Sequence, residues 1–290
     1  MEISERRVEA NGVDFAVLEA GPDDGPLALC LHGFPDSAHT WDGLLPVLGE
    51  AGFRAVAPFM RGYHPTGPAP DGRYQRGVLA ADAIALHSEL GGDHRAVVIG
   101  HDWGAIATYG AAAHSPALWR RVVTMAVPPL AVAGAALADY DQLKRSFYFF
   151  LFQLPLGEGL VAGNDMAFID GLWRDWGPGW DAGAPEHVKV ALRPEGCLLA
   201  AMTYYRAMLQ PDLLDLELSD LEGAGFMPLT QPTLYLHGDS DGAYRADLTQ
   251  VPALLGEGSE VVEIRDAGHF VHLDQPSLTH KLVVDFLTRP

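Results

Sequence analysis

The feature of this chain best suited to chemistry is an acidic residue placed between two glycines at a change of secondary structure. Gly-His-Asp-Trp-Gly occupies residues 100–104, after the apolar run 95–99, which is typical of a short buried strand, and before the helix-forming run 105–111. The glycines let the backbone turn sharply enough to expose the central side chain. We therefore predict that Asp102 is a nucleophile; a helix-capping Asp is the simpler alternative.

The chemistry of a carboxylate nucleophile limits the kind of carbon that it can attack. Attack on an ester or amide would give a labile anhydride, whereas attack on an sp³ carbon gives an ordinary ester that water can cleave. The electrophile should then be an alkyl carbon with a strained or good leaving group. Epoxides and alkyl halides are the two substrate classes that fit this requirement.

A histidine and an acidic residue follow later in the chain, each just after an expected strand. His269 follows the strand expected at 260–264 and is the candidate general base for hydrolysis of the ester. Asp241 follows the strand expected at 233–237 and is the candidate that orients this histidine and stabilises its charged form. Asp239 in the same loop is the second choice for that role.

The segment 238–242 also matches the Gly-x-Ser-x-Gly pattern of serine nucleophiles, with Ser240 at its centre. It lies late in the chain, and no acidic residue follows a further strand at the place that such a nucleophile requires. Asp241 would also sit directly beside this serine. We therefore retain the aspartate nucleophile and reject the serine.

His-Gly-Phe-Pro-Asp at residues 32–36 follows the first central strand, expected at 27–31. A loop in this place supplies one amide of an oxyanion hole, and the residue after the nucleophile supplies the other. We predict that the backbone amides of Phe34 and Trp103 stabilise the charge that develops when water attacks the ester. A solvated loop acid is the simplest interpretation of Asp36, with positioning of the hydrolytic water as the alternative.

Strands and helices alternate in the first part of the chain and again at its end. The expected strands are two within 5–20 around the turn at 11–12, then 27–31, 54–58, 95–99, 121–127, 233–237 and 260–264. The expected helices are 40–49, 78–90, 105–111, a segment near 243–254, and 276–288. This order predicts an α/β fold with a mostly parallel, eight-stranded sheet flanked by helices.

The alternation stops between the two halves of the expected sheet. Residues 129–226 contain aromatic, helix-compatible segments and no convincing strand. We interpret this stretch as an inserted α-helical cap domain, and 1–128 with 227–290 as the core domain. Such a cap would lie over the carboxyl ends of the strands, where open α/β sheets bind their ligands.

Composition excludes several classes of partner. The formal net charge is -19 and the pI about 4.8, which argues against binding of nucleic acid or of an anionic membrane surface. The two cysteines provide neither a disulfide framework nor metal-ligand spacing, and we expect no metal and no cofactor. Without an apolar leader or a bilayer-spanning run, we expect a soluble cytoplasmic protein, either a monomer or a homodimer.

These motifs together resemble the epoxide hydrolase branch of the α/β-hydrolase superfamily over essentially the whole chain. His-Gly-Phe-Pro at 32–35 is similar to its oxyanion motif, Arg-Gly-Tyr at 61–63 to its RGY loop, and 100–105 to its nucleophile elbow. Asp241 and His269 fall where that family keeps its acid and its base. The resemblance implies an α/β-hydrolase fold with an inserted cap.

The resemblance also implies a pair of cap tyrosines that hydrogen-bond and protonate the epoxide oxygen. Tyr148 and Tyr205 lie in segments similar to those that carry this pair. A phenol, with a pKa near 10, is a suitable acid for the alkoxide that ring opening leaves. The aromatic cap suggests an apolar substrate, and the residues expected to contact it are Phe34, Pro35, Trp103, Phe149 and Phe152.

The expected function is hydrolysis of an apolar epoxide to a vicinal diol through a covalent ester on Asp102. A haloalkane dehalogenase is the close alternative; such enzymes resemble this chain but usually pair the Trp after the nucleophile with a second Trp or an Asn. Phe34 occupies the place where that Asn is often found. A non-catalytic binding protein with the same fold is the third hypothesis.

Overall fold

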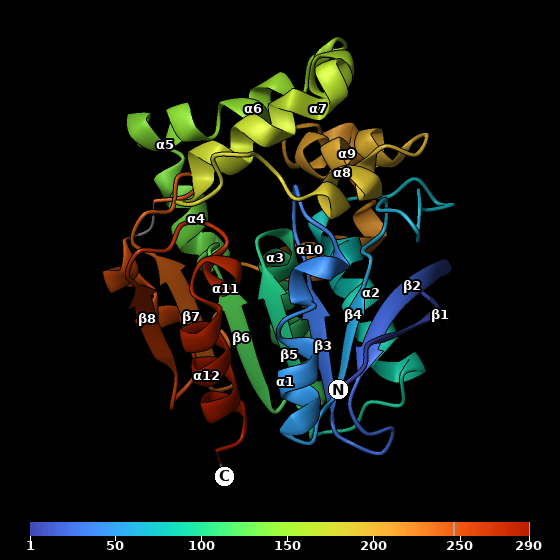
Figure 1. Cartoon of the computed structure of the whole chain (residues 1–290), viewed down its shortest axis with the longest axis vertical. Helices are drawn as coiled ribbons and strands as arrows, with labels where there is room; N and C mark the ends of the chain where they lie inside the picture. Colours follow the sequence, from blue (N-terminus) through green and yellow to red (C-terminus); the bar gives the residue numbers. More distant parts are fainter. Residues whose placement is uncertain (246, 290) are drawn as a thin grey trace.

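Eight strands form one sheet in the computed structural model, which describes residues 1–245 and 247–289 (Figure 1). The strands are β1 (Ser4–Ala10), β2 (Val13–Ala20), β3 (Leu27–Leu31), β4 (Arg54–Pro58), β5 (Val97–His101), β6 (Arg121–Met125), β7 (Thr233–Gly238) and β8 (Glu260–Ile264). Their order is β1-β2-β4-β3-β5-β6-β7-β8. Strand β2 pairs antiparallel with β1 and β4, and the other pairs are parallel. The predicted α/β class and the mostly parallel sheet are confirmed.

Helices cover both faces of this sheet because the central strands are apolar on both sides. In β3, Leu27, Leu29 and Leu31 join one buried cluster, whereas Ala28 and Cys30 join the other. The helices that flank the sheet are α1 (Leu45–Glu50), α2 (Arg76–Glu89), α3 (Trp103–His114), α11 (Val271–Asp274) and α12 (Pro276–Leu287). Helices α1 and α12 pack together on one face, and α2 and α3 on the other (Figure 1).

The chain between β6 and β7 forms helices and, among its described residues, no strand of the sheet. These helices are α4 (Leu130–Ala136), α5 (Tyr140–Arg145), α6 (Phe147–Leu151), α7 (Gly157–Trp176), α8 (Glu186–Leu192), α9 (Cys197–Leu209) and α10 (Ser219–Ala224). Helices α5 to α9 lie across the carboxyl ends of the strands (Figure 1). Helix α10 packs instead against α2 and α3, so part of the predicted segment 129–226 lies against the helices of the core. The division into two domains stays a prediction.

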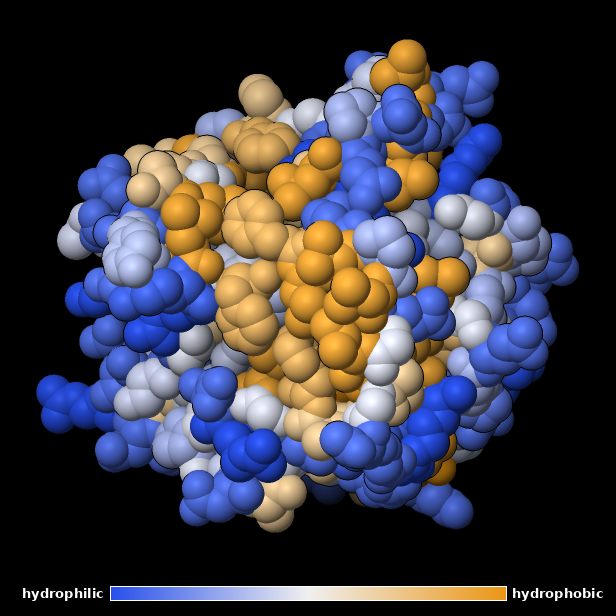
Figure 2. Space-filling model, turned by 90° about the horizontal axis from the view of Figure 1, so that it is seen from above, coloured by the Kyte–Doolittle hydropathy of each residue, from blue (hydrophilic) through white to orange (hydrophobic). Residues whose placement is uncertain are grey.

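The outer face of the inserted helices carries apolar side chains that are open to solvent. Figure 2 looks down on this face and shows hydrophobic residues gathered near its centre. The large hydrophobic residues exposed on α6, α7 and their connection are Phe147, Phe150, Leu154, Leu156 and Leu160. Among the described residues, no helix has the length and apolarity needed to cross a membrane.

The helix predicted near 243–254 is wrong. The described residues there form a loop with two short 3₁₀ turns, Leu248–Gln250 and Pro252–Leu254. Two amides at the start of this loop donate to the side chain of Asp241. A helix over 243–254 would hold Pro252 in its interior, where the missing N–H and the ring oppose a continuous helix.

The single helix predicted over 40–49 is also wrong in its extent. A 3₁₀ turn at Ala38–Trp41 and the short helix α1 share the segment. Pro46 lies in the first turn of α1, where its missing N–H needs no partner. A helix that continued back to residue 40 would place the proline ring against a carbonyl of the preceding turn.

The Arg-Gly-Tyr loop secures the core to the inserted helices. Arg61 is buried, and its Nε and Nη2 donate to the two oxygens of Asp82 at 2.5 and 2.6 Å. Its Nη1 donates to the carbonyl of Arg73 at 2.8 Å. The hydroxyl of Tyr204 on α9 donates to the carbonyl of Arg61 at 2.7 Å. Because the guanidinium is buried, its partners are needed to offset the cost of desolvation.

Candidate active site

Asp102 lies at a sharp turn between β5 and α3. Its backbone has φ 52° and ψ −117°, which is a strained conformation for a residue with a side chain. A Cβ at Gly104 would overlap the carbonyl of Leu31, and one at Gly100 would overlap the carbonyl of Gly104. The two glycines predicted to permit the turn are therefore required by the close approach of neighbouring backbone.

The two oxygens of the Asp102 carboxylate have different surroundings. Oδ1 accepts a hydrogen bond from the backbone amide of Phe34 at 2.7 Å. Oδ2 lies 3.4 Å from Nε2 of His269. The amide of Trp103 is in the first turn of α3, where no intrahelical acceptor exists and the helix dipole favours negative charge. One oxygen is thus held by a backbone donor, while the other is directed to the histidine.

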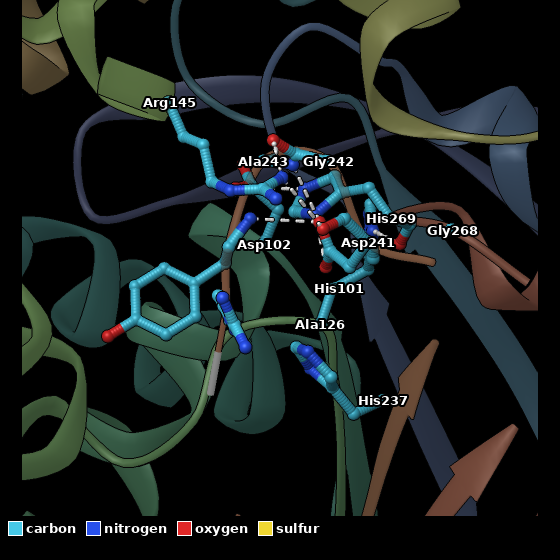
Figure 3. A network of polar contacts seen from close by, with 12 residues as sticks. His101, Asp102, Ala126, Arg145, His237, Asp241, Gly242, Ala243, Gly268 and His269 are labelled. Carbon is cyan, nitrogen blue, oxygen red and sulfur yellow. Dashed lines mark hydrogen bonds and ion pairs between the residues drawn. The ribbon is translucent and has the colours of Figure 1, made fainter. Parts of the chain in front are cut away.

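Asp241 and His269 form a buried hydrogen-bonded pair (Figure 3). Nδ1 of His269 lies 3.0 Å from Oδ2 of Asp241. Oδ1 of Asp241 accepts from the amides of Ala243 and Tyr244 at 2.7 and 2.9 Å. Burial alone would raise the pKa of Asp241, but the charge and hydrogen bond of His269 outweigh it and hold this pKa below its usual value. Asp239, the second choice, is exposed and bonds to the neighbouring serine.

His269 carries two carboxylates as neighbours. Burial alone would lower its pKa, but the charges and hydrogen bonds of Asp241 and Asp102 raise it to about 10. At neutral pH the free protein therefore holds this histidine as a cation between two anions. Loss of the Asp102 charge removes one of the two negative charges that raise the pKa of His269, so this pKa falls. A general base needs such a lowered pKa, because it must accept a proton at neutral pH.

Three further residues position this pair, and no pattern in the sequence indicated them. The amide of His269 donates to the carbonyl of Trp176 at 2.8 Å, and its own carbonyl lies 2.9 Å from Nε2 of His101. Arg145 on α5 reaches from the inserted helices and donates to the carbonyl of Gly242 at 2.9 Å (Figure 3). These contacts join segments far apart in sequence, so local spacing carries no signal of them.

The two cap tyrosines lie beside each other, above the elbow. Tyr148 is on α6 and Tyr205 on α9, and their ring centroids are 5.4 Å apart. Among the described residues, the buried hydroxyl of Tyr205 has no hydrogen-bond partner. Burial raises the pKa of both phenols well above its ordinary value, so both are neutral donors at physiological pH.

A cavity of about 250 Å³ joins the elbow, the histidine and the two tyrosines. Asp102, His269, Tyr148 and Tyr205 all line it. Of the residues predicted to contact a substrate, Trp103 and Phe149 belong to its wall. The structure places the other three behind that wall; they are Phe34, Pro35 and Phe152.

The model of the α/β-hydrolase fold family matches residues 26–276 of this chain, which includes every residue of this arrangement. The chain belongs to the α/β-hydrolase family. The predicted superfamily and fold are confirmed by this match.

Curated relatives of this α/β hydrolase align over nearly its whole length. AB hydrolase superfamily protein YfhM of Bacillus subtilis is 28% identical, with 97% of this chain and 96% of that protein covered. Epoxide hydrolase A of Mycobacterium tuberculosis is 27% identical, with 98% and 97% covered. The solved structure of Epoxide Hydrolase A from Mycobacterium thermoresistibile has a TM-score of 0.76 at 26% identity and covers 99% of this chain and 98% of its own.

Asp36 is buried in this hydrolase, so its interpretation as a solvated loop acid is wrong. Its Oδ1 accepts from the amide of Ser37 at 2.8 Å and lies 3.3 Å from Nε2 of His187, which comes from α8 of the inserted helices. Its other oxygen has no hydrogen-bond partner within the described part of the chain. Burial would raise the pKa of Asp36, but the hydrogen bond and charge of His187 outweigh it and lower this pKa.

One group of side chains in the described structure has the composition of a metal site. Asp36, His101 and His272 place ligand atoms within 4.8 Å of one another, and all three are buried. Nε2 of His272 is held by Thr40 Oγ1 at 2.6 Å, so its Nδ1 is the atom free to bind. The three atoms could hold a divalent cation, or a water molecule that makes two to four hydrogen bonds.

The two aspartates in the loop after β7 allow a direct test of which one orients His269. We expect Asp241→Asn to lower kcat by about 10³- to 10⁴-fold, because the amide can no longer stabilise the charged imidazole. Asp239→Asn, two residues away and exposed, is the matched control and should change kcat by no more than about twofold. The measurement is steady-state turnover of a terminal epoxide by both variants. Equal losses in the two proteins would contradict the assignment of Asp241.

Proposed function

We propose that this α/β hydrolase converts apolar epoxides into vicinal diols through a covalent ester on Asp102. The observation that carries the proposal is the composition of one cavity wall. A carboxylate, a histidine paired with a second carboxylate, and two neutral phenols all face the same apolar space. The curated relatives named epoxide hydrolase support the same reaction class.

The first step opens the epoxide ring. Oδ2 of Asp102 forms a bond to a ring carbon, and the bond from that carbon to the epoxide oxygen breaks. The oxygen leaves as an alkoxide that accepts hydrogen bonds and then a proton from Tyr148 or Tyr205. Both hydroxyls can serve because both phenols are neutral before the reaction. The product of this step is a hydroxyalkyl ester of Asp102.

The second step hydrolyses that ester. Esterification removes the Asp102 charge, so the pKa of His269 falls. The proton on Nε2 passes to the phenolate that the first step left, and Nε2 can then accept a proton from water. The resulting hydroxide attacks the ester carbonyl carbon, and negative charge develops on Oδ1, where the amide of Phe34 already donates. The intermediate collapses, and the diol leaves with the former Oδ2 and a proton from His269. The Asp102 carboxyl group then gives its proton to His269, which restores the carboxylate and the charged histidine.

The tyrosine pair distinguishes an epoxide substrate from a haloalkane. We expect Tyr148→Phe and Tyr205→Phe each to lower kcat for an epoxide by about 10²-fold, the usual cost of losing one donor to a developing oxyanion. Halide release needs no proton, so a haloalkane dehalogenase would keep its rate in both variants. Retained halide release together with no epoxide turnover would overturn the proposal. Ligand binding without turnover of either class would support the non-catalytic alternative.

Tyr204→Phe is the matched control for these two variants. Tyr204 is the neighbour of Tyr205 on the same helix and equally buried, but its hydroxyl donates to the carbonyl of Arg61. Its loss should lower the free energy of unfolding by about 1 kcal/mol. The rate with an epoxide should stay within about twofold of the unmodified protein.

A further inference from the structure

We propose that the substrate is an epoxide with all of its bulk on one ring carbon, a terminal epoxide with a single apolar chain or aryl group. This inference rests on the proposed function and adds the substrate class. Its basis is that the cavity extends away from the reacting groups in one direction only. The opposite side of the tyrosine pair is filled by aromatic rings.

The open side of the cavity runs from the reacting groups to the surface of the molecule. At the inner end Asp102, Tyr205 and His269 are nearly fully buried. At the outer end Leu209 and Phe226 also line the cavity and are 47% and 43% exposed. We name this passage the apolar arm; its wall includes Ile106, Val127, Leu130, Ala133, Leu137 and Met208.

The other side of the tyrosine pair has no such passage among the described residues. Phe152 is fully buried, and its ring centroid lies 5.2 Å from that of Tyr205 and 5.6 Å from that of Tyr148. Phe34 packs 5.5 Å from Phe152 and 5.3 Å from Tyr205. The ring of Trp176 lies 5.3 Å from that of Tyr148. A second substituent on the far ring carbon would have to displace these rings, and a close-packed interior resists such displacement.

Hydrocarbon side chains form most of the wall of the apolar arm. At its polar positions, Nε of Arg76 donates to Glu222 at 2.7 Å, and the hydroxyl of Tyr244 donates to the carbonyl of Ala133 at 2.7 Å. Against the hydrocarbon wall, a polar or charged substituent would lose its hydration without gaining a partner. The chain or ring that occupies it should therefore be a hydrocarbon.

The volume of the cavity limits the size of the part of the substrate that can enter it. An apolar cavity of about 150 Å³ holds benzene, so one of about 250 Å³ holds about ten non-hydrogen atoms. A terminal epoxide with a six-carbon chain has nine such atoms. Longer chains can extend through the outer end of the arm, between Leu209 and Phe226.

Two isomers of one formula test the inference on the full chain. 1,2-Epoxyoctane has one six-carbon substituent, whereas trans-4,5-epoxyoctane divides the same atoms into two three-carbon arms. We expect kcat/KM for the terminal isomer to exceed that for the internal isomer by at least about 100-fold, because a hydrophobic pocket discriminates by about 10- to 200-fold per misplaced methylene. Equal values, or a preference for the internal isomer, would overturn the inference.

Variants on the two sides of the tyrosine pair give a second, independent measurement. Leu137→Trp narrows the arm, so kcat/KM for 1,2-epoxyoctane should fall at least about 10-fold further than kcat/KM for 1,2-epoxypropane. Phe152→Ala removes a ring from the closed side and should raise the internal-to-terminal ratio of kcat/KM at least about 10-fold. Unchanged ratios in both variants would show that these walls do not select the substrate.

The small epoxide separates failure of this inference from failure of the proposed function. Turnover of 1,2-epoxypropane without preference between the two epoxyoctane isomers would overturn the inferred selection for a single substituent. It would leave the epoxide hydrolase proposal intact. No turnover of any of the three epoxides would overturn the proposed function, and the inference with it.

Discussion

Asp102→Ala should abolish epoxide hydrolysis, with kcat reduced by at least about 10⁵-fold, the scale seen when a catalytic nucleophile is removed. The reason is that, among the described residues that line the cavity, Asp102 is the only carboxylate. The measurement is diol formation from 1,2-epoxyoctane under single-turnover conditions with enzyme in excess. A variant that retained the full rate would contradict covalent catalysis at this residue.

A second aspartate provides the control for backbone effects of that substitution. Asp266 follows β8 and has φ 54°, close to the φ of Asp102, but its side chain is exposed. Asp266→Ala therefore removes a carboxylate from a second residue with a positive φ without touching the cavity. We expect its kcat to stay within about twofold of the unmodified protein. An equal loss in both variants would indicate strain rather than chemistry.

His269→Gln should stop the reaction after its first step and leave the ester on Asp102 in place. Glutamine cannot accept a proton from water, so hydrolysis of the ester should slow by at least about 10⁴-fold, while attack on the epoxide needs no base. Intact-protein mass spectrometry after incubation with 1,2-epoxyoctane should show a gain equal to one whole epoxide molecule. Peptide mapping should place that gain on Asp102.

The mass of the adduct also identifies the leaving group. A gain equal to an alkyl group without its halogen, seen with haloalkanes and with no epoxide, would favour the dehalogenase alternative. The control is the double variant Asp102→Ala, His269→Gln, which should show no adduct. An adduct on the double variant would assign the nucleophile to another residue.

Local patterns predicted the elements that position the site. The turn at 11–12 and apolar runs identified all eight strands, and the central runs were the clearest because a strand buried on both faces is apolar throughout its length. Where the pattern was ambiguous the prediction failed, as for the helix near 243–254. Pro252 lies within the predicted span, and its missing N–H and its ring oppose a continuous helix there.

The predicted carboxylate, base and acid are brought together by the structure. Asp102 and His269 are 167 residues apart in the sequence, yet their side chains approach to 3.4 Å. The order of elements made this meeting predictable, because the carboxyl ends of parallel strands lie at one edge of a sheet. Contacts made by backbone atoms left no such signal, and for that reason Arg145 and Trp176 were missed.

The sequence by itself determined the mostly parallel sheet, and it is the basis for proposing Asp102, which lies between two glycines after a buried strand, as a nucleophile suited to an alkyl carbon. Both patterns are local and depend on neighbouring residues. Only the tertiary structure decided the shape of the cavity, the burial of Asp36 and the position of Phe152 behind the wall. The physical reason is that a cavity is the space left when side chains from distant segments pack together, and no local pattern encodes that space.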